Sequence, residues 1–205
     1  EGYGLTIGSV DRIKEMQADL IVTVDTGSLS HKEVDHANSL GIDVIITDHH
    51  NVADQHPKAI AVINPKRKDH SYPYRDFAGV GVAFKLVQAL MTELKGLDNG
   101  QEKWLLDFVA LGTVCDIVPL SGENRMLVSY GLKVLKVSKR EGIKALIASS
   151  GIDLSNINTF DIGFKIGPRL NATGRLKTAR LALDILLTRD LRSALDMAEE
   201  LNNLN

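Results

Sequence analysis

The stretch VIITDHHNV, residues 44–52, ends a run of β-branched residues on an aspartate and two adjacent histidines. A short apolar run of this kind predicts a buried strand of a parallel sheet, here over residues 42–48. Two further runs have the same character, LIVTVD at residues 20–25 and AIAVIN at residues 59–64. We therefore expect three strands, the first of them buried on both faces.

Helices are predicted between and after these strands. Ser30, with Glu33 three residues later, has the spacing of a capping box, and Gly41 is placed to end that helix. Strand, helix and strand in this order form a βαβ unit with a right-handed crossover. From Gly79 onward the apolar spacing is helical, and residues 180–201 form either two helices or one interrupted helix. The predicted fold class is α/β, a parallel β-sheet flanked by helices, followed by a mostly helical part and a connecting helix.

The composition is that of an ordinary globular protein, since 44% of the 205 residues are hydrophobic and 24% are charged. No apolar run approaches about 18 residues, so we expect no membrane partner. Cys115 is the single cysteine, which excludes an internal disulfide and fits a reducing, cytoplasmic location. Because the net charge is −2, any surface for nucleic acid must be local.

Polar side chains follow the first two predicted strands. Asp25 ends one strand, and Asp48, His49 and His50 end the next. Because the ligand crevice of such a sheet lies at the carboxyl ends of its strands, we expect these side chains to lie close together. Carboxylate and imidazole ligands together suit a divalent cation such as Mn²⁺. Neighbouring residues of an extended strand point to opposite faces, so we expect the two histidines to do different jobs.

Each of these residues also has a simpler interpretation. A strand-end aspartate such as Asp25 is often a turn former, and in other folds it accepts a phosphoryl group. Paired histidines such as His49 and His50 are often solvated or structural. Asp116, in GTVCDIVP, ends a helical stretch before a proline. The combination at the two strand ends is hard to explain as turns alone, and it predicts a functional site.

A basic stretch lies near the end of the chain. No acidic residue occurs from residue 162 to residue 183, a segment that contains Lys165, Arg169, Arg175, Lys177 and Arg180. Asn171 and Gly174 are interleaved with these cations. Because arginine presents a planar fork to phosphate oxygens, guanidiniums on a tight, glycine-permitted backbone predict a phosphate clamp.

Two other segments leave alternatives open. Residues 66–75, KRKDHSYPYR, mix basic and aromatic residues, which suits phosphate contact and base stacking, but a solvated loop explains them equally well. The G-x-G of GVGVAF, residues 79–84, can cradle phosphate at a helix start, and close helix packing is an equal explanation.

Several motifs together resemble the DHH phosphoesterase superfamily. TDHH follows a hydrophobic strand, VTVDTG precedes it and ALGTVCDIVP comes later. EGYGL, VINPKRKDHSYP, FAGVGVAFKL and GPRLNATGRL, in this order, are similar to the superfamily's single-strand-specific 5′→3′ exonucleases. The resemblance extends over nearly the whole chain.

The resemblance implies a two-metal site that binds Mn²⁺ or Mg²⁺. Asp25 would bridge the two ions, and His49 and Asp116 would be further ligands. His50 would face the scissile phosphate, and Asp48 would orient the histidines. An activated water would then attack the phosphodiester in line while the metals neutralise the developing charge.

The resemblance also implies contacts to single-stranded DNA, from Arg169, Asn171 and Arg175. The charge pattern adds Lys165 and Lys177 to these predicted contacts. The resemblance further implies a single-strand-binding protein and a helicase as partners. It divides the chain into a DHH phosphoesterase domain at residues 1–178 and a helical segment at residues 179–205 that leads to a second domain outside the chain.

One motif of the superfamily is missing. Its first motif, D-x-D, supplies ligands to the first metal and should precede EGYGL, but no D-x-D occurs before Asp25. The chain also begins with Glu1 rather than methionine and ends in a helical pattern with no stop signal. We therefore expect a piece of a longer protein, a partial domain that is weakly active or inactive alone.

The sequence thus favours a metal-dependent exonuclease that releases nucleotides from the 5′ end of single-stranded DNA in recombination and repair. One alternative is a phosphoesterase for small substrates, such as short oligonucleotides, cyclic dinucleotides or pyrophosphate. Another is a non-catalytic replication module of the same fold. The intact carboxylates and histidine argue against that module, because their mutual repulsion is costly unless metal or substrate offsets it.

Overall fold

The computed structural model describes residues 4–176 and 179–205, except for the side chains of residues 172–176. The chain forms two compact units. The first comprises Glu1–Glu102 and Ser121–Asn124, and the second comprises Lys103–Leu120 and Arg125–Asn205.

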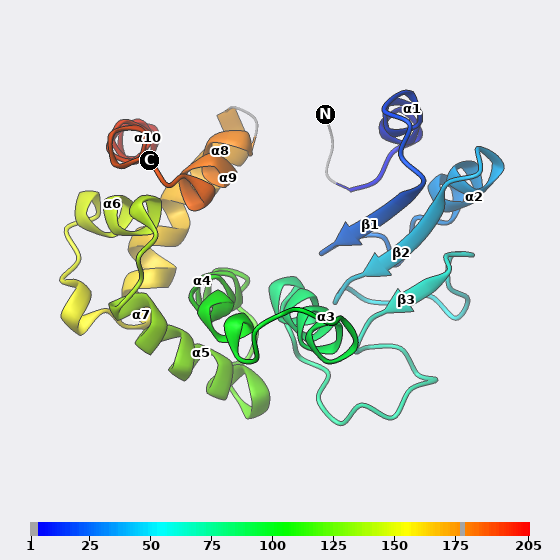
Figure 1. Cartoon of the computed structure of the whole chain (residues 1–205), viewed down its shortest axis with the longest axis horizontal. Helices are drawn as coiled ribbons and strands as arrows, with labels where there is room; N and C mark the ends of the chain where they lie inside the picture. The colour runs from blue at the N-terminus through cyan, green and yellow to red at the C-terminus, as the bar shows by residue number, and fades with distance from the viewer. Residues whose placement is uncertain (1–3, 177–178) are drawn as a thin grey trace. The chain divides into compact units, whose positions relative to one another are not determined.

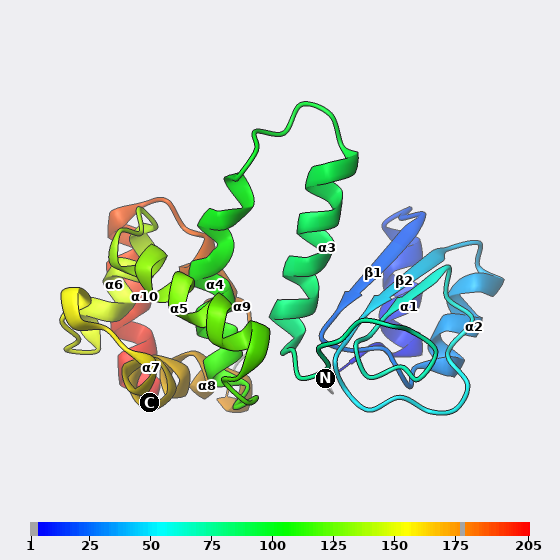
Figure 2. The same ribbon diagram turned by 90° about the horizontal axis from the view of Figure 1, so that it is seen from below.

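The first unit is a three-stranded parallel sheet with helices on both faces (Figures 1 and 2). Its strands lie in the order β1 (Leu20–Val24), β2 (Asp43–Thr47) and β3 (Ala61–Ile63). Helices α1 (Ile7–Glu15) and α2 (His31–Ser39) lie on one face, and α3 (Gly79–Glu93) lies on the other. The predicted parallel sheet and its three strands are therefore confirmed.

The core of this unit lies between the sheet and helices α1 and α2. It consists of Val10, Ile21, Val34, Ala37, Ile42, Val44 and Ile46. Each fully buried aliphatic side chain stabilises the fold by roughly 1.5–3 kcal/mol relative to an exposed one. These side chains fix the sheet on its helices and so fix where the strands end.

Strand β1 is buried on one face only. Ile21 and Thr23 are buried, whereas Leu20, Val22 and Val24 are 48%, 45% and 54% exposed. The prediction that β1 is buried on both faces is wrong. A continuous apolar run shows that a strand suits a parallel sheet, but it does not show whether a second layer covers it.

Helix α2 begins directly after Ser30, as predicted, but the Ser30 side chain makes no capping hydrogen bond. The predicted capping box is therefore wrong. Gly41 follows the end of the helix with a φ of +71°, in the left-handed region that favours glycine.

The second unit is helical. Its elements are α4 (Leu106–Cys115), α5 (Gly122–Lys136), α6 (Glu141–Ser149), η2 (Leu154–Asn156), α7 (Thr159–Asp161), the π-helical turn η3 (Ile162–Ile166), α8 (Gly167–Leu176), α9 (Arg180–Leu187) and α10 (Leu191–Leu204). A short 3₁₀ helix, η1 (Gln101–Leu105), precedes them, and α5 begins within the first unit.

Helices α9 and α10 contribute to the core of the second unit. Ile185, Ala194 and Leu201 are fully buried there, in one cluster with residues of α4, α5 and α6. Residues 180–201 thus form two helices, the first of the two predicted alternatives. That the segment 179–205 leads to a further domain stays a prediction. Across the described ranges, no helix is both long enough and apolar enough to cross a membrane.

Candidate metal centre

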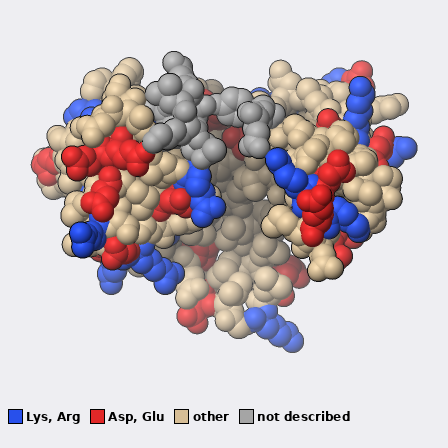
Figure 3. All heavy atoms as spheres, turned by 90° about the horizontal axis from the view of Figure 1, so that it is seen from above, with Lys and Arg blue, Asp and Glu red and all other residues tan. Residues whose placement is uncertain are grey.

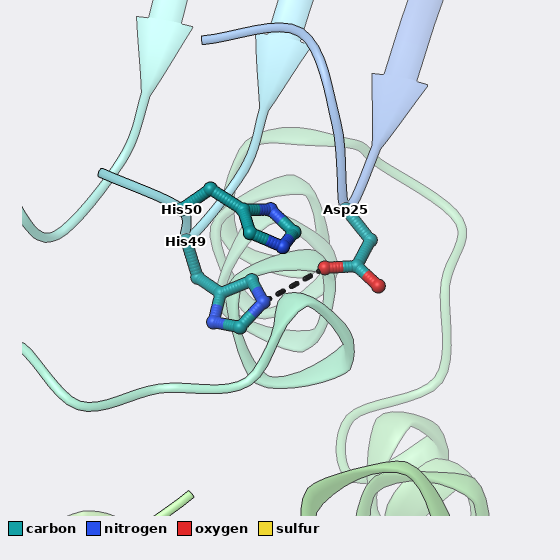
Figure 4. A group of neighbouring side chains, drawn as sticks. All are labelled: Asp25, His49 and His50. Carbon is teal, nitrogen blue, oxygen red and sulfur yellow. Dashed lines mark ion pairs between the residues drawn. The ribbon is translucent and has the colours of Figure 1, made fainter. Parts of the chain in front are cut away.

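Asp25, His49 and His50 come together at the carboxyl ends of β1 and β2 (Figure 4). One ligand atom of each lies within 4.8 Å of the others. His49 Nε2 is 3.0 Å from Asp25 Oδ1, and the centroids of the two imidazole rings are 4.5 Å apart. The His49 side chain is only 8% exposed, whereas that of Asp25 is 52% exposed, so the group has a buried wall and an open side.

Both imidazoles approach Asp25, so the expectation that they point to opposite faces is wrong. Strand β2 ends at Thr47, and the two histidines follow it in irregular backbone. The alternation of side chains holds only along an extended strand, and it stops where the strand stops.

The backbone of Asp25 has an uncommon conformation. Its φ is +63°, in the left-handed region, which aspartate tolerates better than most residues. Its N–H donates to the Thr47 carbonyl at 2.9 Å. Gly79, the first residue of α3, packs directly against its carboxylate, because a Cβ at Gly79 would lie 2.2 Å from Asp25 Oδ1. Close packing, the second interpretation of the G-x-G, therefore applies at Gly79.

Asp48 is buried beside the histidines. Its Oδ1 is 2.8 Å from His50 Nδ1 and accepts the His49 N–H at 2.8 Å, and its Oδ2 accepts the Ser28 N–H at 2.9 Å. Burial opposes the charged form, but the hydrogen bonds from Ser28 and His50 outweigh it and lower the pKa of Asp48 to about 2. Because this carboxylate is ionised at neutral pH, His50 Nδ1 carries the proton, which leaves Nε2 for the cluster.

Ser28 and Asn64 extend this network, and the sequence did not single out either of them. Both are buried. Asn64 Nδ2 donates to Ser28 Oγ at 2.8 Å and to the His50 carbonyl at 2.9 Å. Asn64 directly follows β3, so the strand-end rule that selected Asp25 would also have found it.

Asp116, the third predicted metal ligand, belongs to the second unit. It is the exposed C-cap of α4. The next residue, Ile117, has a φ of +59°, which is unusual for a β-branched side chain.

The predicted DNA-binding residues also lie in the second unit. Lys165 Nζ donates to Asp161 at 2.7 Å. The Arg169 guanidinium donates to Asn202 Oδ1 at 2.8 Å and to the Lys165 carbonyl at 2.7 Å. Asn171 is exposed on α8. The Arg175 side chain and Lys177 lie outside the described residues.

Residues 167–176 form an α-helix, so the predicted tight backbone at this position is wrong. Pro168 stands second in α8, which continues directly from the π-helical turn η3, and a glycine within a helix does not by itself make a turn. On the face drawn in Figure 3, acidic and basic side chains are interspersed, which is consistent with the net charge of −2.

The donor set of Asp25, His49 and His50 fits a divalent cation. One carboxylate and two imidazoles offer the mixed oxygen and nitrogen ligands that Mn²⁺ accepts. Asp48 supplies the hydrogen bond that orients the His50 ring toward Asp25 and His49. Fold and site together define a class, α/β proteins with a metal-binding group at the carboxyl edge of a parallel sheet.

The DHH family, N-terminal domain, matches residues 6–113, which is more than half of the chain. The chain belongs to the DHH family.

Known relatives match the whole chain. It is 46% identical to the "Single-stranded-DNA-specific exonuclease RecJ" of Salmonella typhimurium and 43% identical to the protein of that name from Bacillus subtilis, over 100% of its length. It spans 37% and 25% of those proteins, respectively.

Solved structures of RecJ proteins also match the fold of this chain. A crystal structure of exonuclease RecJ bound to manganese matches 100% of this chain with a TM-score of 0.88 and 35% identity, over 50% of that chain. RecJ from Thermus thermophilus in complex with Mn²⁺ matches 97% of this chain with a TM-score of 0.85 and 34% identity, over 29% of that chain.

Proposed function

We propose that this chain is part of a metal-dependent exonuclease, a hydrolase that releases nucleotides from the 5′ end of single-stranded DNA in recombination and repair. The observation that carries the proposal is the Asp25–His49–His50 group, in a chain 46% identical over all its residues to a single-stranded-DNA-specific exonuclease. We propose Mn²⁺ or Mg²⁺ as the cofactor, because the similar RecJ structures are complexes with these ions.

The proposed chemistry is phosphodiester hydrolysis. Bound metal ions supply an activated water and neutralise charge on the phosphate. Asp25 and His49 would hold one ion, and Asp116 would be a further ligand. Asp48 holds the proton on His50 Nδ1, so that His50 Nε2 would face the scissile phosphate.

The proposed contacts to the DNA backbone come from Lys165, Arg169, Asn171, Arg175 and Lys177. Support comes from Arg169, whose guanidinium is already fixed by Asn202 and by a main-chain carbonyl and so loses little freedom on binding phosphate. The proposal includes a cytoplasmic location, with a single-strand-binding protein and a helicase as partners. The single cysteine and the family resemblance support these assignments.

Calorimetric titration of Mn²⁺ tests the metal centre. We expect saturable binding by the chain, and loss of that binding in His49→Ala. His31→Ala, at the start of α2 in the same unit, is the matched control and should bind as the unaltered chain does. Binding unchanged by His49→Ala would overturn the proposed ligand set.

A cleavage assay tests the substrate. Single strands labelled at the 5′ or the 3′ end, a duplex and a dinucleotide are offered with Mn²⁺. Mononucleotides released from the 5′ end of the single strand support the proposal. A preference for the dinucleotide would favour the small-substrate phosphoesterase. Metal binding without hydrolysis of any of them would fit both a partial exonuclease domain and the non-catalytic module.

A further inference from the structure

A cavity of about 280 Å³ lies in the first unit, and one of its lining residues, Asn64, is hydrogen-bonded to His50 of the metal centre. It lies between the end of β3, the loop of residues 64–77 and the first turns of α3. Phe77 and Val82, which are 2% and 3% exposed, form an apolar floor. Arg67, Tyr72 and Lys85 also line the cavity and bring two cations and an exposed aromatic ring to it.

Asn64 connects the cavity to the metal centre. It lines the cavity, and its side-chain amide donates to the His50 carbonyl at 2.9 Å. The same amide donates to Ser28 Oγ, and the Ser28 N–H holds the Asp48 carboxylate. Asn64 therefore contacts both the cavity and the main chain of His50, one of the residues of the metal centre.

The polar groups around the cavity are already paired with one another. Glu123 lies 2.5 Å from Lys85 Nζ and accepts the Tyr72 hydroxyl at 2.7 Å. Arg67 is bonded to Asp69 at 2.6 Å. These pairs leave mainly ring faces and alkyl surface for a ligand, so the cavity suits a flat, largely apolar group.

The cation at the cavity is held over aromatic rings. Lys85 Nζ is 5.7 Å from the ring centroid of Tyr72 and 5.6 Å from that of Phe77. Burial opposes the charge on Lys85, but the hydrogen bonds and charge interactions with Glu123 and Tyr72 together outweigh it and raise the pKa of this lysine. A cavity lined by aromatic side chains favours a ligand that carries a flat ring.

We propose that this cavity binds one base of the DNA strand, at the nucleotide next to the bond to be cleaved. The base would lie over Phe77 and Val82 with its edge against Tyr72, while its phosphate lies at the metal centre. Stacking of this kind depends little on sequence, because every base has a π-face. The inference rests on the proposed function, but it concerns base recognition and not hydrolysis.

Two ligands that differ only in the base test this inference. Deoxyadenosine 5′-monophosphate and deoxyribose 5-phosphate are titrated without metal into the whole chain, and binding is followed by NMR. We expect the nucleotide to bind about tenfold more tightly than the sugar phosphate. Tyr72→Ala, which removes the exposed ring, and Val82→Trp, which fills the floor, should each abolish this preference.

Tyr130→Ala is the matched control. Tyr130 lies in the second unit, is 56% exposed and also has a lysine, Lys133, above its ring at 4.7 Å. Its substitution should leave the preference unchanged. Because Tyr72 lies at the surface, Tyr72→Ala remains informative if Val82→Trp does not fold.

Equal affinity for the two ligands in the unaltered chain would overturn the inference, and so would a preference that survives Tyr72→Ala. This titration tests base recognition separately from the proposed hydrolysis, because it is carried out without the metal that hydrolysis requires. A base preference in a chain that binds no Mn²⁺ would remove the exonuclease proposal and keep a nucleotide-binding cavity. Hydrolysis of DNA without a base preference would keep the exonuclease proposal and remove the nucleotide-binding cavity.

Discussion

At the scale of single residues, Gly79 controls the position of Asp25. A Cβ at Gly79 would lie within 2.6 Å of three Asp25 atoms, so Gly79→Ala must displace that carboxylate. Displacing a group that holds or orients a metal ligand typically weakens metal binding by about 10–100-fold. We expect a loss of Mn²⁺ affinity in this range, measured by calorimetry, with a circular dichroism spectrum like that of the unaltered chain.

Gly8→Ala is the control for this substitution. Gly8 is also helical, and a Cβ there would meet no atom within 4 Å. Its Mn²⁺ affinity should be unchanged. Normal Mn²⁺ binding by Gly79→Ala would show that Asp25 is not a ligand or that it is not held by Gly79.

Asp48 should make the stability of the first unit depend on pH. Its folded pKa of about 2 lies below the ordinary value of 3.8, so its contribution is present above pH 3.8 and is lost as the pH falls toward 2. Near neutral pH the contribution is about 2 kcal/mol. Asp48→Asn should therefore weaken protection of the β2 amides from hydrogen exchange at pH 7, and the difference should shrink at pH 3.

Asp54→Asn is the matched control, because the Asp54 side chain is 94% exposed. It should leave exchange of the β2 amides unchanged at both pH values. A difference between Asp48→Asn and the unaltered chain that is as large at pH 3 as at pH 7 would contradict the electrostatic explanation.

The sequence identified these residues only in part. The rule that strand ends meet at one edge predicted the approach of Asp25 to His49, because β-branched runs mark strand ends well. It did not predict the direction of the His50 ring, which depends on backbone beyond the strand. The role of Gly79 depends on how α3 packs on the sheet, and local sequence carries no sign of such a contact.

At the scale of elements, a glycine allows α6 to pack against α9. A Cβ at Gly142 would lie 1.6 Å from the Ile185 carbonyl oxygen, and a main-chain atom cannot move aside as a flexible side chain can. Gly142→Ala must therefore separate the two helices. Overpacking of this kind costs about 1–3 kcal/mol, so we expect Tm in a thermal denaturation to fall by several degrees.

Gly163→Ala is the matched control in the same unit. A Cβ there would lie 3.6 Å from Val114, an ordinary van der Waals contact. Its Tm should stay close to that of the unaltered chain. Equal Tm values for Gly142→Ala and Gly163→Ala would mean that α6 and α9 can separate without loss of stability.

The elements themselves were largely predictable. The three strands lie within the predicted ranges, because their apolar runs are short and bounded by polar residues. The Ser30 capping bond and the backbone of residues 167–176 were predicted wrongly. The capping bond depends on the rotamer of Ser30, and the helix of residues 167–176 depends on continuity with the preceding helical turn. A motif of a few residues encodes neither.

At the scale of the whole molecule, the net charge of −2 bears on the proposed surface for DNA. Binding of single strands should then depend on a few local cations and weaken steeply with salt. Each phosphate contact adds about 0.7 to the slope of log affinity against log salt. Arg169→Gln should lower the slope measured by fluorescence anisotropy by about this amount.

Arg180→Gln provides the comparison. Arg180 also lies within residues 162–183, the segment that contains no acidic residue, but its guanidinium is paired with Asp184 at 2.8 Å. We expect a smaller change of slope for this variant. An unchanged slope in Arg169→Gln would exclude Arg169 from contact with the phosphates.

The chain passes between its two units three times, after Glu102, Leu120 and Asn124. Neither unit therefore corresponds to a continuous piece of sequence. A chain that ended at residue 102 would lack Glu123, the residue that holds Tyr72 and Lys85. Gene rearrangement cannot transfer either unit alone by moving one uninterrupted coding segment.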